Sequence, residues 1–245
     1  MEAAIRLRAR TRPRSRASAA AAKSSASDTQ ARVLEAASEL FAERGFAGTT
    51  IREIAQRAKV NVATGHYHFG SKLEIYLEAV SAQFAALDAR LAVEGAQPSP
   101  EDLERLSRAA IESLLERQIR TMLEFLIGPP PAPHGAIMQR EMCDPSEALP
   151  MMVRELVLPQ KRKLRAIVSR LAPSLGPREL DRCCFSIVGQ VFFFRQMLPI
   201  LPLLFDLPAL PASFVADTAD HITAFALGGI AAAERRAAAP RRARA

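Results

Sequence analysis

Apolar residues recur at intervals of three and four along the chain from Asp28 onward, and no run alternates strictly between apolar and polar positions. The first spacing places side chains on one face of an α-helix, whereas alternation is typical of a half-buried strand. We therefore predict an all-α fold, with an N-terminal three-helix DNA-binding unit and a C-terminal helical domain.

The first predicted helix ends at Gly45, where a left-handed C-terminal cap is expected. Its apolar stripe is formed by Val33, Ala36, Ala37, Leu40 and Phe41. Thr50 and Glu53 then form a capping box that begins a second helix, and Ser71 and Glu74 form another that begins a later one. A short helix from Asn61 is expected between them, so the spacing is typical of a helix-turn-helix in which one helix braces and the next enters the major groove.

The segment from Val33 to Val80, VLEAASELFAERGFAGTTIREIAQRAKVNVATGHYHFGSKLEIYLEAV, closely resembles the DNA-binding domain of the tetracycline-repressor (TetR) family. The similarity includes LFAERGF at the end of the first helix, TTIREIAQRAKV as the bracing helix and turn, and YHFGSK after the recognition helix. It is strongest to the branch that includes the CecR-like regulators.

The resemblance implies that Thr50, Tyr67, His68 and Lys72 contact phosphates, which fixes register without reading sequence. Base edges would be read from the exposed start of the recognition helix, by Asn61, Val62, Ala63, Thr64 and His66.

Two residues depart from the family pattern. Gly65 replaces a bulky core residue, which costs on the order of 1 kcal/mol of helix stability, and His66 stands where Tyr or Asn is common, so affinity and site can differ from those of relatives.

The formal net charge of +7 comes from the two ends of the chain. Residues 1–23 hold seven basic residues and one acidic residue, and residues 234–245 hold five and one, so the body between them is slightly acidic. We predict a disordered basic arm over residues 1–26 and a disordered basic tail over 235–245. The alternating arginines from Arg6 to Arg16 either follow DNA into a minor groove or form a solvated tail.

The remaining chemistry argues against an enzyme. The chain has no phosphate-binding glycine loop, no metalloprotease helix motif and no nucleophile elbow, and its three cysteines, Cys143, Cys183 and Cys184, include no C-x-x-C pair. We expect no catalytic residues, no metal and no cofactor. No apolar run is long enough to span a bilayer, so we expect a cytoplasmic protein without membrane contact.

The C-terminal domain is predicted over residues 98–234, after a DNA-binding domain over 27–87 whose motif covers about 50–69. Its helices are expected at about 101–126, 136–142, 149–171, 177–198 and 211–236, with a loop at 128–135 and a break or kink at Pro159.

A methionine-rich region in the middle of this domain is suited to an apolar effector, since thioethers pack adaptably. The predicted pocket residues are Met122, Phe125, His134, Met138, Arg140, Glu141, Met142 and Met152. Ordinary core is the alternative interpretation of the methionines. In the resembling family the last two helices pair with those of a second copy, which implies a homodimer here. The predicted interface residues are Ile187, Val191, Phe194, His221, Phe225 and Gly229.

The sequence thus favours a regulator of transcription that binds an inverted repeat in double-stranded DNA as a homodimer and is released by a small-molecule effector. The alternative is an accessory or architectural DNA-binding protein without a sensor, which binds irrespective of sequence through its basic tails.

Overall fold

The computed structural model describes residues 16–61, 70–127 and 135–239. Within these ranges every regular element is a helix, which confirms the predicted all-α fold. The order is α1 (Arg16–Arg44), α2 (Ile51–Arg57), α4 (Lys72–Val93), α5 (Pro100–Arg105), α6 (Arg108–Ile127), α7 (Ala136–Cys143), α8 (Leu149–Met152), a π-helical turn η1 (Val153–Val157), α9 (Leu158–Leu171), α10 (Pro177–Met197), α11 (Leu201–Leu204) and α12 (Phe214–Ala238).

Both basic ends are helical further than predicted. Helix α1 begins at Arg16, inside the arm expected to be disordered, and α12 continues to Ala238, inside the expected tail. Alanine is the commonest residue of the first extension and makes up half of the second, with arginine as the other half; alanine has the highest helix propensity of all residues, and arginine is also a good helix former. The arginines from Arg6 to Arg14 lie outside the described residues. At its other end α1 stops at Gly45, whose φ of 73° confirms the predicted left-handed cap.

The first hydrophobic core joins α1, α2 and α4. The stripe predicted for α1 is buried there, together with Ile54, Ala58, Ile75, Tyr76, Ala79 and Val80. Three residues from beyond the DNA-binding segment complete the same core: Ile137 of α7, Ala148 just before α8, and Met152 of α8. The core around the DNA-binding helices therefore includes part of the C-terminal domain.

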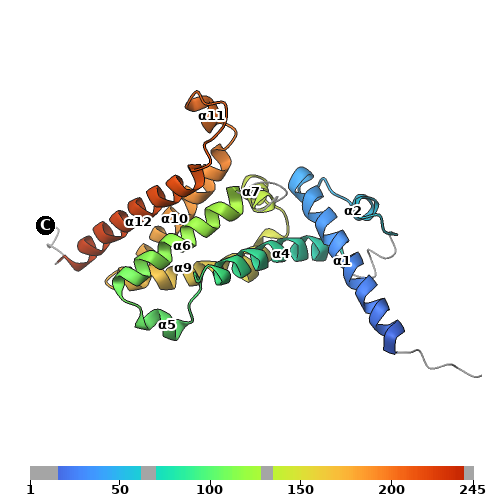
Figure 1. The fold of residues 1–245 in the computed structure, drawn as a ribbon, viewed down its shortest axis with the longest axis horizontal. Coiled ribbons are helices and arrows are strands. Elements are labelled where there is room, and N and C mark those ends of the chain that lie inside the picture. Colours follow the sequence, from blue (N-terminus) through green and yellow to red (C-terminus); the bar gives the residue numbers. More distant parts are fainter. Residues whose placement is uncertain (1–15, 62–69, 128–134, 240–245) are drawn as a thin grey trace, which may run out of the picture.

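The second core lies among α6, α9, α10 and α12, which form the bundle on the left of Figure 1. Arg120 of α6 is ion-paired with Asp220 of α12 at 2.6 Å, and Ile222 and Val191 are fully buried between helices. Helix α4 runs from the DNA-binding end into this bundle (Figure 1), and its Leu91 is buried in the second core.

The single long helix predicted over 101–126 is wrong, because the chain breaks between α5 and α6. Leu106 has an extended ψ of 139°. The Ser107 hydroxyl accepts a hydrogen bond from the Ala110 N–H at 3.3 Å, so it satisfies an exposed donor at the start of α6. A serine side chain competes with the helix for backbone hydrogen bonds, which explains why the apolar stripe alone misled.

The break expected at Pro159 takes the form of η1 just before it. Proline has no N–H and its ring crowds the carbonyl of the preceding turn, and a wider π-helical turn accommodates both. None of the five residues of η1 is buried. In the described part of the chain, no helix is both long and apolar enough to cross a membrane.

Candidate nucleic-acid interface

Helix α2 begins at Thr50, one of the predicted phosphate contacts. Its hydroxyl accepts from the Glu53 N–H at 3.2 Å, and Glu53 in return accepts from the Thr50 N–H at 2.9 Å and from the Thr50 hydroxyl at 2.7 Å. These hydrogen bonds from Thr50, together with the Arg44 guanidinium, hold the pKa of Glu53 below its usual range. The predicted capping box is confirmed, and Thr50 remains exposed.

Three ion pairs brace α2 against α1, one of them between Arg57 and Glu43 at 3.6 Å. Arg57 reaches Glu39 at 2.9 Å, and Arg44 reaches Glu53 at 2.8 Å. The opposite side of α2 is exposed and carries Arg52 and, in the following turn, Lys59. Both side chains are suitable phosphate partners, and neither was among the phosphate contacts predicted from the sequence. The sequence did contain a signal for them, because both cations lie away from the apolar face of α2 that carries Ile54.

The turn after α2 has the sharp geometry that a helix-turn-helix requires. Lys59 adopts a φ of 56°, and the Val60 N–H donates to the Ala55 carbonyl at 2.9 Å. Asn61 follows at the surface. The other predicted base and phosphate contacts, namely Val62, Ala63, Thr64, His66, Tyr67 and His68, lie outside the described residues.

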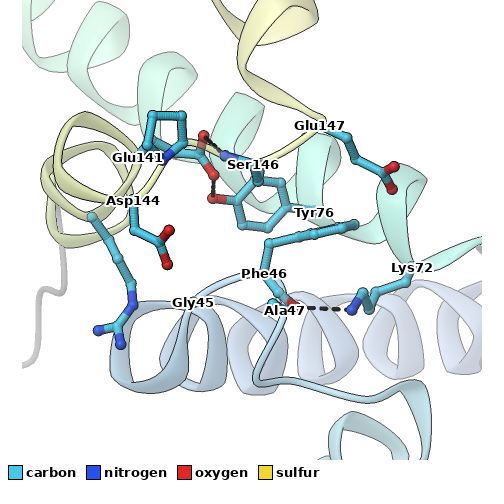
Figure 2. Close-up of a pocket in the computed structure, with 11 residues that line it drawn as sticks. Gly45, Phe46, Ala47, Lys72, Tyr76, Glu141, Asp144, Ser146 and Glu147 are labelled. Carbon is cyan, nitrogen blue, oxygen red and sulfur yellow. Dashed lines mark hydrogen bonds between the residues drawn. The ribbon is translucent and has the colours of Figure 1, made fainter.

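Helix α4 begins with the second predicted capping box. The Glu74 carboxylate accepts from the Ser71 N–H at 2.7 Å, and the Ser71 hydroxyl accepts from the Glu74 N–H at 3.2 Å. Lys72 lies half-buried, with Nζ 2.9 Å from the Phe46 carbonyl oxygen and 4.2 Å from the centre of the Phe46 ring (Figure 2). An ammonium group has three N–H donors, and this carbonyl uses one, so the geometry is compatible with a phosphate contact as well.

A cavity of about 390 Å³ lies between the end of α1, the start of α4 and the segment linking α7 to α8 (Figure 2). Tyr76 and Glu141 form one wall, and the Tyr76 hydroxyl donates to the Glu141 carboxylate at 2.5 Å. Arg140 also lines the cavity and donates to the Glu43 carbonyl at 3.2 Å. The cavity is therefore at the junction of the DNA-binding helices with the C-terminal domain.

Of the predicted effector residues, Arg140 and Glu141 line this cavity, whereas the methionines and Phe125 do not. Met122 and Phe125 pack in the second core, whereas Met138 and Met152 pack in the first. Met142 is 55% exposed, because the short helix α7 buries only the side that carries Ile137 and Glu141. Glu141 lines the cavity while its carboxylate accepts from Tyr76, and His134 lies outside the described residues. Methionine content did not distinguish pocket from core.

The predicted dimer residues divide in the same way. Ile187 and Val191 are buried within the bundle and cannot reach a second copy, because they lie on the side of α10 that faces α6 and α12; Phe194 is half-buried beside them. His221, Phe225 and Gly229 are exposed on α12. Two aromatic residues of α10 that the prediction missed, Phe185 and Phe193, are 63% and 57% exposed. Because α10 carries apolar residues on all sides, its sequence does not show which side is buried in the bundle and which is exposed.

Comparison with known proteins agrees with these two parts. Residues 33–79 match the bacterial regulatory proteins of the tetR family, and residues 111–230 match the C-terminal domain of the HTH-type transcriptional dual regulator CecR. CecR of Shigella flexneri is 29% identical over 171 residues, which cover 67% of this chain and 74% of that protein. The transcriptional repressor Rv3405c of Mycobacterium tuberculosis is 35% identical over 113 residues, covering 46% and 53%.

Among solved structures, AibR in complex with isovaleryl coenzyme A and operator DNA has a TM-score of 0.59 at 14% identity, covering 80% of this chain and 97% of AibR. That likeness concerns the fold. The family is one of regulators rather than enzymes. This chain is therefore a DNA-binding transcription regulator of the TetR family, with a C-terminal domain of the CecR type.

Proposed function

We propose that the protein is a homodimeric repressor that reads an inverted-repeat operator and leaves it when a small, partly apolar effector binds. The observation that carries the DNA-reading part is the frame around the recognition segment. One end is fixed by the braced α2 and the turn at Lys59, and the other by the Ser71 cap of α4. Both flanks of this segment therefore have the geometry that a helix-turn-helix requires.

In this proposal the contacts divide into two groups. Thr50, Tyr67, His68 and Lys72 hold phosphates, with Arg52 and Lys59 as further cationic partners. Base edges are read by Asn61, Val62, Ala63, Thr64 and His66. The exposure of Thr50, Arg52, Lys59 and Asn61 supports this division.

The homodimer is supported by the outer face of α10 and α12. Phe185 and Phe193 are exposed on α10 and Phe225 is exposed on α12, and a side chain added at Gly189 or Gly229 would meet nothing within 4 Å. Large exposed aromatic side chains are typical of an interface, and the neighbouring glycines leave room for the helices of a second copy to approach closely. A two-fold axis through these helices would place the DNA-binding helices of the two copies about 34 Å apart, which is the distance between successive major grooves.

Release by effector is supported by the structural relative that contains both operator DNA and an acyl-CoA. The effector is proposed to favour a conformation of the dimer in which the DNA-binding helices of the two copies no longer match successive major grooves. In that case effector and DNA must weaken each other's binding by the same factor. Isovaleryl-CoA and longer acyl-CoA compounds are accordingly the first effector probes.

The test is to incubate the purified protein with fragmented DNA from its source at near-physiological salt, recover the bound fragments and sequence them. Enrichment of an inverted repeat supports the proposal and gives a probe for effector titration. Uniform recovery would instead support the accessory DNA-binding function that the basic ends suggest. An effector that binds but leaves operator affinity unchanged would exclude relief by ligand.

A further inference from the structure

The boundary between the two hydrophobic cores does not coincide with the boundary between DNA-binding and C-terminal segments. Ile137, Ala148 and Met152 are fully buried among side chains of α1, α2 and α4. From Leu164 onward the buried apolar residues belong to the other core, apart from Leu201 of α11. We define the reading head as α1, α2 and the first half of α4. Helices α7 and α8 are therefore packed against the reading head, in the same core.

One buried hydrogen bond fixes this packing in a specific orientation. Tyr76 of α4 is 1% exposed and Glu141 of α7 is 2% exposed, and the tyrosine hydroxyl donates to the carboxylate at 2.5 Å. The other carboxylate oxygen accepts from the Ser146 N–H at 3.1 Å. Apolar packing tolerates sliding, whereas a hydrogen bond between two buried groups is satisfied in a narrow range of positions.

Tyr76 passes this constraint on to the start of the DNA-binding motif. Its ring lies edge-on to Phe41 at 4.7 Å and to Phe46 at 5.0 Å between ring centres. The same Phe46 ring carries Lys72. A displacement of Glu141 would therefore act on the end of α1, on the loop before α2 and on the first turn of α4.

The connection from α8 to the second core is of a different kind. Turn η1 links α8 to α9, and none of its residues is buried. Its Leu156 packs half-buried against the first core, but a segment without fully buried side chains changes at less cost than a core helix does. Helices α7 and α8 thus have a rigid attachment to the reading head and a weakly packed attachment to the bundle.

We propose that Glu141 is a positioning residue for DNA recognition, which holds the first half of α4 to α7 through Tyr76 and so sets the orientation of the reading head relative to the C-terminal domain. This rests on the proposed operator binding. A dimer must present both heads one DNA turn apart, and a small tilt of each head lowers affinity without removing any contact residue.

The test uses the single variants Tyr76→Phe and Glu141→Met and the double variant, in the full-length protein. Tyr76→Phe leaves Glu141 with the Ser146 N–H as its remaining partner, and Glu141→Met removes the acceptor of both the Tyr76 hydroxyl and the Ser146 N–H, so loss of DNA binding in a single variant could reflect instability alone. The double variant replaces both groups by apolar ones of similar size, which is expected to restore most of the stability. The control is Asp220→Asn, which removes an ion pair within the bundle.

A positioning role predicts that the double variant unfolds at nearly the wild-type denaturant concentration but binds the recovered inverted repeat about tenfold more weakly, with an unchanged salt slope. The control should bind as wild type does. Wild-type operator affinity in the double variant would overturn the proposal.

A second readout does not need an operator. In the double variant, hydrogen exchange of backbone amides from Ile75 to Val80 should be at least threefold faster than in wild type, while exchange in α6 is unchanged. Equal exchange in α4 would overturn the proposal. If wild-type protein selects no DNA sequence, the proposed function fails, and this exchange comparison still tests whether Glu141 holds α4 to α7 through Tyr76.

Discussion

Tyr76 and Glu141 are 65 positions apart in sequence, yet they share a buried 2.5 Å hydrogen bond that joins the DNA-binding helices to α7. Burial and the adjacent carboxylate raise the pKa of Tyr76, so its hydroxyl keeps the proton that it donates. By contrast, the side-chain hydrogen bonds of Arg32, Arg44 and Arg57, which join α1 to α2 and to the turn after it, lie at the surface.

The first prediction concerns the stability that this bond provides. Tyr76→Phe leaves Glu141 buried with the Ser146 N–H as its remaining partner. We expect a loss of about 1–3 kcal/mol in the free energy of unfolding, because a buried carboxylate loses a donor. Urea unfolding followed by circular dichroism measures it. An unchanged midpoint would mean that water replaces the hydroxyl.

Lys72 is predicted to contact a phosphate in addition to the Phe46 carbonyl. Lys72→Met should reduce the slope of log affinity against log salt concentration by about 0.9 for each copy, hence by roughly two per dimer. Arg178→Gln, which removes an exposed cation at the start of α10, should leave the slope unchanged. Weaker binding with an unaltered slope would show that Lys72 only holds the loop before α2.

Phe225 and Ile187 are predicted to behave differently although both were expected at the dimer interface. Phe225→Asp should give monomers in sedimentation velocity at concentrations where the wild type is a dimer, because the side chain is 64% exposed in the protomer. Ile187→Ala should instead lower the free energy of unfolding by about 2–5 kcal/mol, because the side chain is buried. Dimeric Phe225→Asp protein would place the interface elsewhere.

Asp88 should make stability depend on pH. Burial alone would raise its pKa, but hydrogen bonds to Oδ1 from Lys163 at 2.7 Å, Gln160 at 2.9 Å and Gln97 at 2.5 Å hold the pKa below its usual range. A lowered pKa stabilises the fold fully above the carboxyl's ordinary value of about 4 and loses this effect as pH falls through the lowered value.

Asp88→Asn should therefore destabilise the protein by about 1–2 kcal/mol at neutral pH, and the difference from wild type should shrink in acid. Urea midpoints of both proteins at neutral pH and at about pH 3 measure this. A difference that is constant with pH would mean that the carboxylate charge contributes nothing.

Local signals in the sequence predicted the DNA-binding frame well. Both capping boxes and the Gly45 cap occur as expected, because each depends on residues within one turn of the chain. The same locality explains the failure at Ser107, where one hydroxyl outweighs an uninterrupted apolar stripe.

The effector and dimer predictions depended on contacts between distant segments, and periodicity does not identify the partner of an apolar face. Met122 and Met152 look alike in sequence but belong to different cores. Ile187 and Phe193 lie on one apolar helix, and only the packing of α6 and α12 decides which is buried. The hydrogen bond between Glu141 and Tyr76 could not be predicted from periodicity either, because the two residues are remote in sequence.

The most direct test of the central claim is the ratio of affinities for the recovered inverted repeat and for a scrambled duplex of equal length and composition, measured at near-physiological salt. Specific operator recognition predicts a ratio of about a thousand or more. A ratio near one, with a steep salt dependence for both duplexes, would contradict the account, because it would mean that binding depends on phosphate charge alone.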